Sequence, residues 1–253
     1  ERHTSNCQRV AMAINLVIAG CCGRMGQRIA ALALDGRAPS MRLVGAVEAH
    51  GHPSVGQDVG TVLGRAPIGV VVMDDVHAAL RDSGVLGEFT TPEATIDHVR
   101  AAQQARAAMV IGTTGLSEPA RELIRQCAED IPIVLSPNMS VGVNVLFELV
   151  ETAARRLGAA YTVDLEETHH AGKKDRPSGT AKRMQELLAA VRSPAAGPEA
   201  IPCRSIRTGE VVGEHVVTFH DATERLTLTH EALSRDVFAL GALRAAQFVA
   251  VQR

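Results

Sequence analysis

The polar stretch from residue 166 to residue 181 holds the side chains of this chain that are best suited to chemistry. It contains two adjacent histidines, His169 and His170, with Lys173 shortly after them. Histidine is the only side chain whose ordinary pKa lies near neutrality, and lysine carries a positive charge that can also give up a proton. A Pro-Ser-Gly-Thr run at 177–180 then leads into a helix-like segment. This pattern suggests an anionic substrate held by cations and helix-terminal amides, with a proton donor nearby.

The same residues have plainer interpretations. A loop of this polarity can be an ordinary connection to a capped helix, and a single histidine is more often structural than catalytic. Two histidines also raise the question of a zinc site. No third and fourth ligands follow at zinc-binding spacing, however, so we expect no metal. The elements around the stretch must decide between these alternatives.

A glycine-rich loop near the start of the chain predicts a dinucleotide site. Residues 14–19 form an apolar run typical of a strand buried in a parallel sheet, and residues 27–34 show helical spacing. Between them, Gly20 permits a tight turn, Gly23 lets the backbone approach a pyrophosphate, and Gly26 lets helix and strand pack closely. The spacing is GxxGxxG rather than GxGxxG, and a simple tight turn is the alternative.

An acidic residue at the end of the second predicted strand strengthens the dinucleotide interpretation. The strand covers residues 41–47, and Glu48 follows it 22 residues after Gly26. That is close to where a carboxylate hydrogen-bonds the adenosine ribose in such sites.

Strands and helices alternate up to about residue 136. We predict strands over 68–73, 85–90, 109–111 and 131–136, a short element at 76–80, and helices over 92–108 and 118–129. This alternation predicts an α/β fold with a doubly wound parallel sheet, in which ligands bind beyond the carboxyl ends of the strands. The glycine loop and Glu48 lie at such ends, as do residues 89–91, 112–115 and 136–139.

The pattern changes after Val143. We predict a helix over 145–157, an alternating strand over 161–168, a helix from about 180 to 192, strands of one antiparallel sheet at 206–207, 213–219 and 225–229, and a last helix over 240–251. The expected organisation is a dinucleotide-binding domain of residues 12–137 and 230–253, with a smaller α+β substrate domain of residues 138–229. We expect residues 1–11 to be a disordered leader.

The composition of the chain limits the kinds of partner it can bind and the cellular compartment expected for it. The 253 residues suffice for two modest domains, and a formal charge of −2 gives no reason to expect a nucleic-acid or anionic-membrane partner. The 5 cysteines are odd in number and lack paired spacing, which favours free thiols in a reducing cytoplasm. No apolar run is long enough for a transmembrane helix, and residues 1–11 lack the apolar core of a signal peptide.

A nicotinamide site combined with a small substrate domain suggests hydride transfer. Reduction of a C=N or conjugated C=C bond places negative charge on nitrogen or an adjacent carbon, which a nearby acid must neutralise. Either Lys173 or His169 could supply that proton. Lys174 is expected to be solvated, and Asp175 to orient a neighbouring side chain or cap the following turn.

Taken together, these motifs resemble the 4-hydroxy-tetrahydrodipicolinate reductase (dihydrodipicolinate reductase) family of the diaminopimelate pathway of lysine biosynthesis. The family's signature, His-His-x-x-Lys-x-Asp-x-Pro-Ser-Gly-Thr-Ala, is present at residues 169–181 and is highly specific. The resemblance extends over nearly everything from Ile14 onward. It includes Gly-Arg-Met-Gly at 23–26, Phe-Thr at 89–90, Gly-Thr-Thr-Gly at 112–115, residues 136–144, and the Arg-x-Gly-x-x-x-Gly-x-His run from Arg207 to His215.

The resemblance implies roles for individual residues. His169 and Lys173 would be the catalytic pair, with Lys173 the favoured proton donor. The two substrate carboxylates would be bound by His170, Ser178, Gly179 and Thr180. The cofactor-binding set would be Gly20, Gly23, Arg24, Met25 and Gly26 at the pyrophosphate, Glu48 at the ribose, and Phe89, Gly112, Thr113, Thr114, Ser136, Pro137, Asn138 and Met139 towards the nicotinamide. The family is NAD(P)H-dependent, and its substrate domain builds a homotetramer through its sheet.

Three departures from the family pattern matter. Ala49 follows Glu48 where many relatives carry Arg or Lys for the 2′-phosphate of NADPH, so NADH is favoured, with NADPH accepted through His50 or Arg24. Gly87-Glu88 replaces the usual apolar-acidic pair before Phe-Thr. Met139 stands where Phe is commoner and keeps an apolar contact.

Two rival functions remain. Another two-domain nicotinamide-dependent oxidoreductase of amino-acid metabolism, such as a homoserine or aspartate dehydrogenase, should lack the His-His…Lys…Pro-Ser-Gly-Thr loop. A catalytically inactive nucleotide-binding module should have lost His169, Lys173 or the glycines, and this chain keeps all of them.

Overall fold

A computed structural model describes residues 13–81, 84–192 and 197–252 of the chain. The described residues form two compact units, one from residues up to 134 together with those from 243 onward, the other from 135 to 242. The expected leader at 1–11 lies outside the described residues. These units are defined by packing, and the functional division into a nucleotide domain and a substrate domain stays a prediction.

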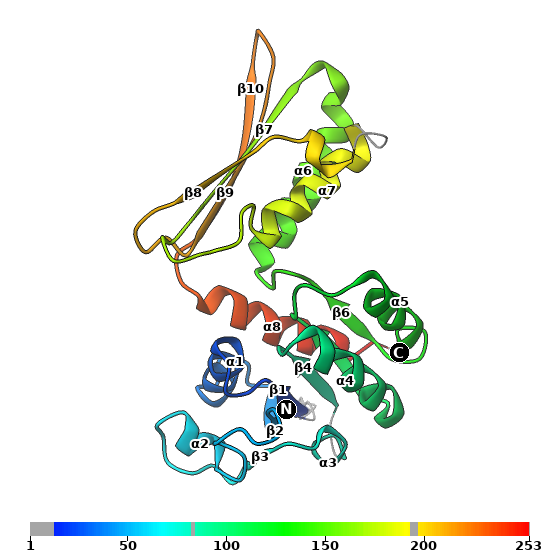
Figure 1. Ribbon diagram of the computed structural model, residues 1–253, viewed down its shortest axis with the longest axis vertical. Coiled ribbons are helices and arrows are strands. Elements are labelled where there is room, and N and C mark those ends of the chain that lie inside the picture. Colours follow the sequence, from blue (N-terminus) through cyan, green and yellow to red (C-terminus); the bar gives the residue numbers. More distant parts are fainter. Residues whose placement is uncertain (1–12, 82–83, 193–196, 253) are drawn as a thin grey trace, which may run out of the picture. The chain divides into compact units, whose positions relative to one another are not determined.

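The first unit is built on a six-stranded sheet with the order β3-β2-β1-β4-β5-β6 (Figure 1). The strands are β1 (Ile14–Ala19), β2 (Met41–Val47), β3 (Val72–Met73), β4 (Val85–Glu88), β5 (Ala108–Ile111) and β6 (Ile133–Leu135). The β1–β2, β1–β4, β2–β3 and β4–β5 pairs are parallel, and the direction of winding reverses between β1 and β4. A ligand is expected at that switch point in a sheet of this kind.

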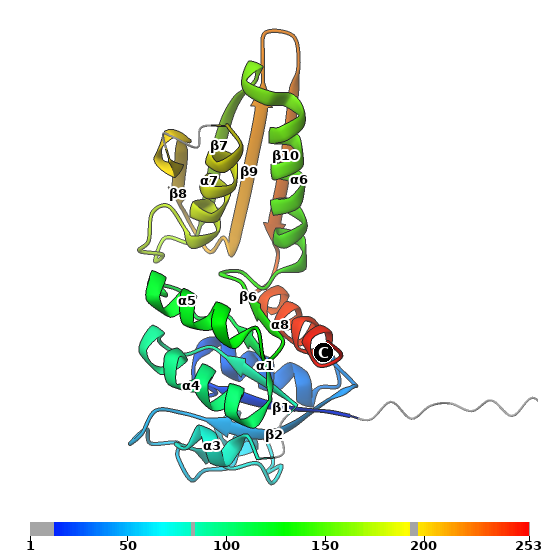
Figure 2. The ribbon, with the colours of Figure 1, turned by 90° about the vertical axis from the view of Figure 1, so that its right-hand side faces the viewer.

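Helices connect these strands, as parallel pairing requires. They are α1 (Arg24–Leu34), α2 (Val59–Val62), α3 (Val76–Ala79), α4 (Pro92–Ala105) and α5 (Glu118–Cys127). Figures 1 and 2 show α1 on one face of the sheet and α4 and α5 on the other. Both faces are therefore covered, and Leu16 to Ala19 of β1 are almost fully buried as the continuous apolar run predicted.

The strand predicted over 68–73 was largely wrong, because only Val72 and Met73 form β3. The preceding residues bend instead, with Gly69 at a φ of 82°. The carboxylate of Asp58 accepts hydrogen bonds from the backbone N–H groups of Ile68 and Gly69 at 2.9 and 2.7 Å. A side chain thus takes the amides that a longer strand would have used.

The second unit contains a four-stranded sheet with the order β10-β9-β7-β8. Its strands are β7 (Thr162–His169), β8 (Cys203–Arg207), β9 (Gly213–His220) and β10 (Arg225–Ala232). The sheet is mixed, so the predicted antiparallel sheet needs correction: β7 is antiparallel to β9 but parallel to β8. The reason is connectivity, since helix α7 (Gly179–Arg192) carries the chain back between β7 and β8.

Helices α6 (Val141–Leu157) and α7 lie along one face of this sheet (Figure 2). Short 3₁₀ turns, η1 (Gly158–Ala160) and η2 (Pro198–Ala200), follow each of them. Alternate residues of β7 face the helices, beginning with Val163 and Leu165 and ending with Glu167 and His169. The buried face therefore changes from apolar to ionisable towards the end of the strand.

Element ends differ from the sequence predictions by a few residues. Helix α4 ends at Ala105 rather than 108, because Arg106 adopts a left-handed conformation with φ 53°. Helix α6 begins at Val141, where Ser140 caps it, and the last helix, α8, covers Asp236–Val249.

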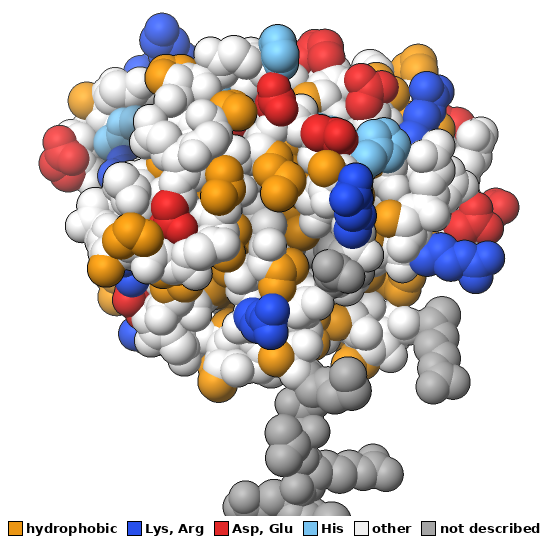
Figure 3. Space-filling model, turned by 90° about the horizontal axis from the view of Figure 1, so that it is seen from below, with side chains coloured by type: hydrophobic (Ala, Val, Ile, Leu, Met, Phe, Trp, Pro, Cys, Tyr) orange, Lys and Arg blue, Asp and Glu red, His pale blue; other side chains and the backbone are white. Residues whose placement is uncertain are grey.

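The described helices include none with both the length and the apolar character needed to cross a membrane. On the face shown in Figure 3, acidic, basic and apolar side chains are interspersed.

Candidate active site

A buried carboxylate organises the polar end of the β7 face. Glu167 is fully buried, and its Oε1 accepts a hydrogen bond from Arg207 Nη2 at 2.7 Å. Its Oε2 lies in hydrogen-bonding contact with Nδ1 of His169. Burial alone would raise the pKa of Glu167, but hydrogen bonds from Arg207, Ser205 and His169 hold it below its ordinary value. Glu167 is therefore an anion with fixed partners.

His169 is held in one orientation by that carboxylate. Its side chain is 11% exposed, and its ring meets the ring of His215 edge to face at a centroid distance of 5.2 Å. Burial lowers the pKa of His169, and the positive charges of Lys173 and Arg207 lower it further against the opposing effect of Glu167. The imidazole is therefore neutral near pH 7, and Nδ1 carries the proton because a carboxylate can only accept.

Gly213 gives this ring its space. A Cβ atom at that position would lie 3.0 Å from His169 Nε2 and 3.3 Å from Cδ2. The backbone of β9 at Gly213 therefore lies directly against the His169 ring, and a side chain at position 213 would displace the ring.

Arg207 also fixes the backbone of the loop that carries Lys173. Its Nε donates to the carbonyl of Lys173 at 3.3 Å, and Nη2 donates to the carbonyl of Asp175 at 2.5 Å. The Lys173 ammonium forms an ion pair with Asp175 at 2.8 Å, with 23% of the lysine side chain exposed. That ammonium lowers the pKa of Asp175 despite partial burial of the carboxyl. One arginine therefore positions both the histidine's partner and the lysine's loop.

Ser178 joins this cluster to the start of α7. Its Oγ accepts from the backbone N–H of Ala181 at 3.2 Å and so caps the helix, and its own N–H donates to Glu167 Oε1 at 3.3 Å. Its Oγ also lies 3.3 Å from His215 Nε2. Burial lowers the pKa of His215 to about 3, and its Nδ1 is buried without a hydrogen-bond partner among the described residues.

The segment before α6 contacts the same helix start. Asn138 Nδ2 donates to Thr180 Oγ1 at 2.9 Å, and Asn138 Oδ1 accepts from the backbone N–H of Ser140 at 2.9 Å. Ser136 Oγ donates to the carbonyl of Asn138 at 2.7 Å. Met139 is buried. These residues, predicted to contact the cofactor, thus lie in the second unit and adjoin the predicted substrate residues.

The glycine loop of the first unit has the shape of a dinucleotide cradle. A Cβ at Gly26 would lie 2.1 Å from the carbonyl oxygen of Gly20, and one at Gly20 would lie 2.4 Å from that of Phe89. Gly20 has a φ of 75°. Helix α1 starts after Gly23 without a side-chain cap, so its first N–H groups remain available to an anion. These features fit the pyrophosphate of a dinucleotide.

Glu48 is held against that loop. Its Oε2 accepts from the backbone N–H of Cys22 at 3.0 Å, and its Oε1 accepts from the N–H of Ala49 at 3.0 Å. Ala49 is exposed, and the neighbouring His50 pairs with Asp74 at 2.7 Å.

A second buried carboxylate lies at the end of β4. Glu88 is fully buried. Its Oε1 accepts hydrogen bonds from Oγ1 of Thr90 and, at 3.1 Å, from Oγ1 of Thr95. Its Oε2 lies 2.6 Å from Nδ1 of His98. The N–H of Thr90 donates to Thr113 Oγ1 at 3.2 Å. Thr113 Oγ1 donates to Glu88 Oε1 at 3.5 Å, so the predicted cofactor loops around Phe89 and Gly112 are tied together through Glu88. The Phe89 ring packs against Gly112, where a Cβ would meet it at 2.2 Å.

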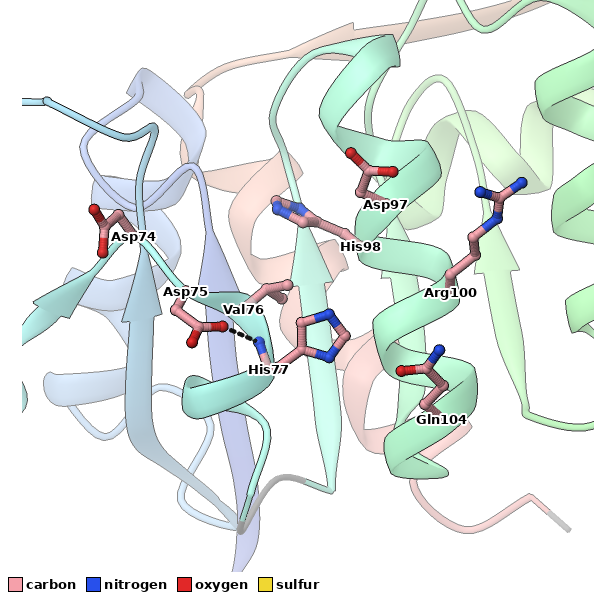
Figure 4. Close-up of a pocket in the computed structure, with 8 residues that line it drawn as sticks. All are labelled: Asp74, Asp75, Val76, His77, Asp97, His98, Arg100 and Gln104. Carbon is pink, nitrogen blue, oxygen red and sulfur yellow. Dashed lines mark hydrogen bonds between the residues drawn. The ribbon is translucent and has the colours of Figure 1, made fainter.

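A cavity of about 470 Å³ lies near His98, between α3 and α4, and Figure 4 shows the residues that line it. Its lining consists of Asp74, Asp75, Val76, His77, Asp97, His98, Arg100 and Gln104. His98 belongs both to this lining and to the Glu88 network. The cavity contains no residue predicted for the site.

Two clusters of the described residues have ligand atoms spaced for a metal ion: Cys21, Cys22 and Glu48, and Glu167, His169 and His215. In the second cluster the Arg207 guanidinium already supplies the positive charge beside Glu167, and the carboxylate's oxygens are engaged. Glu167 and Nδ1 of His169 in this cluster therefore already have partners.

The structure thus places the predicted residues in two groups, one per unit. In the second unit, Glu167 and Arg207 link His169, Ser178 and the backbone of Lys173. Asn138 bonds Thr180 at the same helix start, and the carbonyl of His170 accepts from the N–H of Lys173 at 3.1 Å. The glycine loop, Glu48, Phe89 and the Gly112 loop make up the other group. Arg24 and Thr114 are exposed, and Met25 is half-buried.

Sequence reasoning gave no role to Glu167, Arg207 or His215. A signal for Glu167 existed, because it stands two residues before His169 and so shares its strand face. Arg207 and His215 lie in a segment that matched the family pattern, but their sequence distance from the loop concealed the contact.

Two family models match the chain along most of its length. One, described as dihydrodipicolinate reductase, N-terminus, matches residues 14–139, and the other, dihydrodipicolinate reductase, C-terminus, matches residues 142–253.

Individual proteins agree with these models. The chain is 44% identical over 249 residues to the 4-hydroxy-tetrahydrodipicolinate reductase of Anaeromyxobacter dehalogenans strain 2CP-C, covering 92% of each chain. It is 42% identical over 255 residues to the enzyme of that name from Nitrosomonas europaea, covering 95% of this chain and 94% of the other. Among solved structures, the dipicolinate-bound dihydrodipicolinate reductase from Paenisporosarcina sp. TG-14 shares the fold, with a TM-score of 0.75 and 24% identity over 94% of this chain and 96% of that one.

Proposed function

The chain belongs to the dihydrodipicolinate reductase family, and from that premise we propose how its residues divide the work of the reaction. It is a 4-hydroxy-tetrahydrodipicolinate reductase of lysine biosynthesis, an oxidoreductase of a family that uses NAD(P)H. The reaction yields tetrahydrodipicolinate in the diaminopimelate pathway. When bound, the nicotinamide supplies the hydride, and the residues of the chain supply binding, orientation and the proton.

Lys173 is the proton donor. The observation that carries this assignment is the contact of His169 Nδ1 with the buried carboxylate of Glu167. Because that nitrogen holds the proton of a neutral ring, Nε2 is an acceptor and cannot deliver a proton without a second protonation, which burial opposes. Lys173 carries its proton as an ammonium on a partly exposed side chain. His169 then orients the substrate and polarises it.

The start of α7 binds the substrate carboxylates. Ser178 caps the helix, and Gly179 and Thr180 form its first turn, where N–H groups lack intrahelical partners and the helix dipole favours an anion. His170 completes the set from the loop. A dicarboxylate can thus be held by amides and hydroxyls while Lys173 supplies the compensating charge.

The glycine loop and Glu48 bind the dinucleotide, with NADH favoured over NADPH. The close-packed glycine loop and the uncapped start of α1 support dinucleotide binding. The exposed neutral Ala49 beside the carboxylate of Glu48 supports the preference for NADH. Arg24 and Met25 border the pyrophosphate. The residues assigned to the nicotinamide, as the family pattern implies, are Phe89, Gly112, Thr113, Thr114, Ser136, Pro137, Asn138 and Met139.

The protein acts in the cytoplasm as a homotetramer. Cys21, Cys22, Cys127 and Cys203 are free thiols, which suits a reducing compartment. Helices cover one face of the second unit's sheet, so the other face is available for pairing with further copies. Residues 138–229 therefore serve both substrate binding and assembly, and residues 12–137 with 230–253 bind the dinucleotide.

Turnover with enzymatically prepared substrate tests the activity directly. Purified protein should oxidise NADH, with NADPH accepted at a higher KM, as followed by loss of nicotinamide absorbance. Absence of oxidation with either nucleotide would refute the activity, and a lower KM for NADPH would refute the stated preference.

A further inference from the structure

Two adjacent thiols and a carboxylate meet inside the glycine loop. The Sγ atoms of Cys21 and Cys22 lie 3.7 Å apart, and a carboxylate oxygen of Glu48 lies within 4.8 Å of both. Cys21 is buried, whereas Cys22 and Glu48 are half-exposed, so the cluster is open to solvent on one side. The family reaction gives no task to either thiol.

The spacing of the sulfurs matches what a tetrahedral ion requires. Two thiolates bound to zinc at about 2.3 Å in tetrahedral geometry lie about 3.8 Å apart. The carboxylate oxygen must come to roughly 3.5 Å from each sulfur for the same geometry, a shift of at most about 1.3 Å that side-chain rotation can provide. Two sulfurs and one oxygen would leave the fourth position to water.

We propose that Cys21, Cys22 and Glu48 form a binding site for a thiophilic divalent cation, Zn²⁺ or Cd²⁺, whose occupation excludes the dinucleotide. Binding replaces the two S–H bonds by two metal–sulfur bonds and releases two protons to solvent, with no change in oxidation state. Softer Cd²⁺ binds thiolates more tightly than Zn²⁺ does at such a site.

Exclusion of the dinucleotide follows from the position of the ligands. The cation would draw the carboxylate of Glu48 away from the ribose, and the N–H of Cys22 now donates to that same carboxylate. The cation would also lie in the loop between Gly20 and Gly23, where the proposed pyrophosphate must come close to the glycine backbone. The exclusion rests on the proposed function of this loop, whereas the binding of the cation does not.

Burial of the Cys21 thiol opposes its deprotonation and so weakens cation binding. Desolvation raises the pKa of the Cys21 thiol, and the neighbouring Cys22 and Glu48 raise it further. A coordinating thiol is nevertheless deprotonated outright by the ion's own charge. Affinity should therefore rise with pH.

Titration of the full chain with Cd²⁺ alone tests the site. The ultraviolet charge-transfer absorption of Cd–thiolate bonds should saturate at one ion per chain. A Cys7→Ser/Cys127→Ser/Cys203→Ser variant, which keeps only the adjacent pair, should give the same signal, and Cys22→Ser should lose it. Glu48→Gln should weaken Cd²⁺ binding at least about 10-fold, because even substitution of a residue that only hydrogen-bonds a metal ligand typically costs that much affinity. Thermal unfolding of each variant verifies that it folds.

Equal absorption from Cys22→Ser, or its loss from the triple variant, would overturn the site. NADH binding, measured by its fluorescence, should be competitive with Cd²⁺, and simultaneous binding would overturn the exclusion. Turnover of the metal-free enzyme is measured separately, so failure of the cation site and failure of the proposed function give different results.

Discussion

Glu167 determines which ring nitrogen of His169 carries the proton. Glu167 can only accept a hydrogen bond, so the ring presents its unprotonated nitrogen on the side of Gly213. We therefore propose that His169 orients the substrate and that Lys173, which the family resemblance already favoured, donates the proton.

Lys173→Ala should abolish most turnover while nucleotide binding is retained. Loss of a positioned general acid typically lowers the rate by about 10²–10⁴-fold. Measurements of kcat, with NADH affinity determined separately, check this. Lys174→Ala is the matched control, since that side chain is exposed and has no assigned role. Comparable loss in both variants would remove the proton-donor role from Lys173.

Ala49→Arg should shift cofactor preference towards NADPH. A guanidinium beside Glu48 can bond the 2′-phosphate, and a charge-assisted bond contributes about 1.5–3 kcal/mol, or roughly 10-fold or more in affinity. The KM for NADPH should fall by that factor while the KM for NADH changes little. Ala49→Gln provides similar length without charge and should have a smaller effect. No change in the NADPH KM would show that the phosphate lies elsewhere.

At the scale of elements, strands β7 and β9 bring the reactive side chains together. Their antiparallel register places Glu167 opposite His215, and the parallel pairing of β7 with β8 places His169 opposite Arg207. These four buried side chains of one sheet thus support a loop that has no regular structure of its own. Helix α7 contributes its N-terminus to the same place.

The histidines of this sheet should make stability depend on pH. The pKa of His215 is lowered to about 3 by burial, and those of His169 and His230 are also lowered. Below pH 6.5 the unfolded chain gains protons that the folded chain does not, so stability falls as pH falls and is unaffected above that value. His215 alone should account for about 2 kcal/mol between pH 6.5 and pH 5.

Urea unfolding at several pH values measures this dependence. His215→Asn should flatten the slope below pH 6.5 by about 1.4 kcal/mol per pH unit, the effect of one proton. Glu167, whose pKa is lowered, acts in the same direction but only where carboxylates titrate, at more acidic pH. His77→Asn replaces an exposed histidine and controls for the substitution. An unchanged slope in His215→Asn would contradict the assignment.

At the scale of the whole molecule, the helix-free face of the second unit's sheet is expected to join four copies. This face carries Glu166, Val216, Thr218 and Thr227, with a shallow cavity of about 350 Å³ among them. Alternation along the strands gives that face its own set of side chains, independent of those facing α6 and α7.

Analytical ultracentrifugation should therefore give four times the 26.8 kDa mass of the chain. Val216→Asp places a charge on this face and should dissociate the assembly while the circular dichroism of the fold is kept. Thr223→Asp, in the β9–β10 turn, is the control with an added charge away from the face. A monomeric parent protein would refute the assembly.

The sequence by itself determined the parallel sheet, the glycine loop and the reactive stretch, because each of these is local. Burial on both faces makes a strand continuously apolar, and a tight loop demands glycine at fixed spacing. Residues 14–19 and 41–47 form strands with the predicted bounds. The predicted antiparallel pairing holds for β7–β9 and β9–β10, but β8 pairs in parallel with β7, and the strand at 68–73 was largely wrong. Pairing direction and side-chain capture of amides depend on distant partners.

Only the tertiary structure decided which atoms meet. Glu167 and Arg207 are 40 residues apart, and Ser178 and His215 are 37 apart, so no spacing in the sequence signals their contacts. The Arg207 contact keeps Glu167 an anion beside His169, and Arg207 also holds the backbone around Lys173. The reactive residues could therefore be found from their types and order, whereas the division of roles between them depends on a buried carboxylate whose partners come from two strands and a helix start.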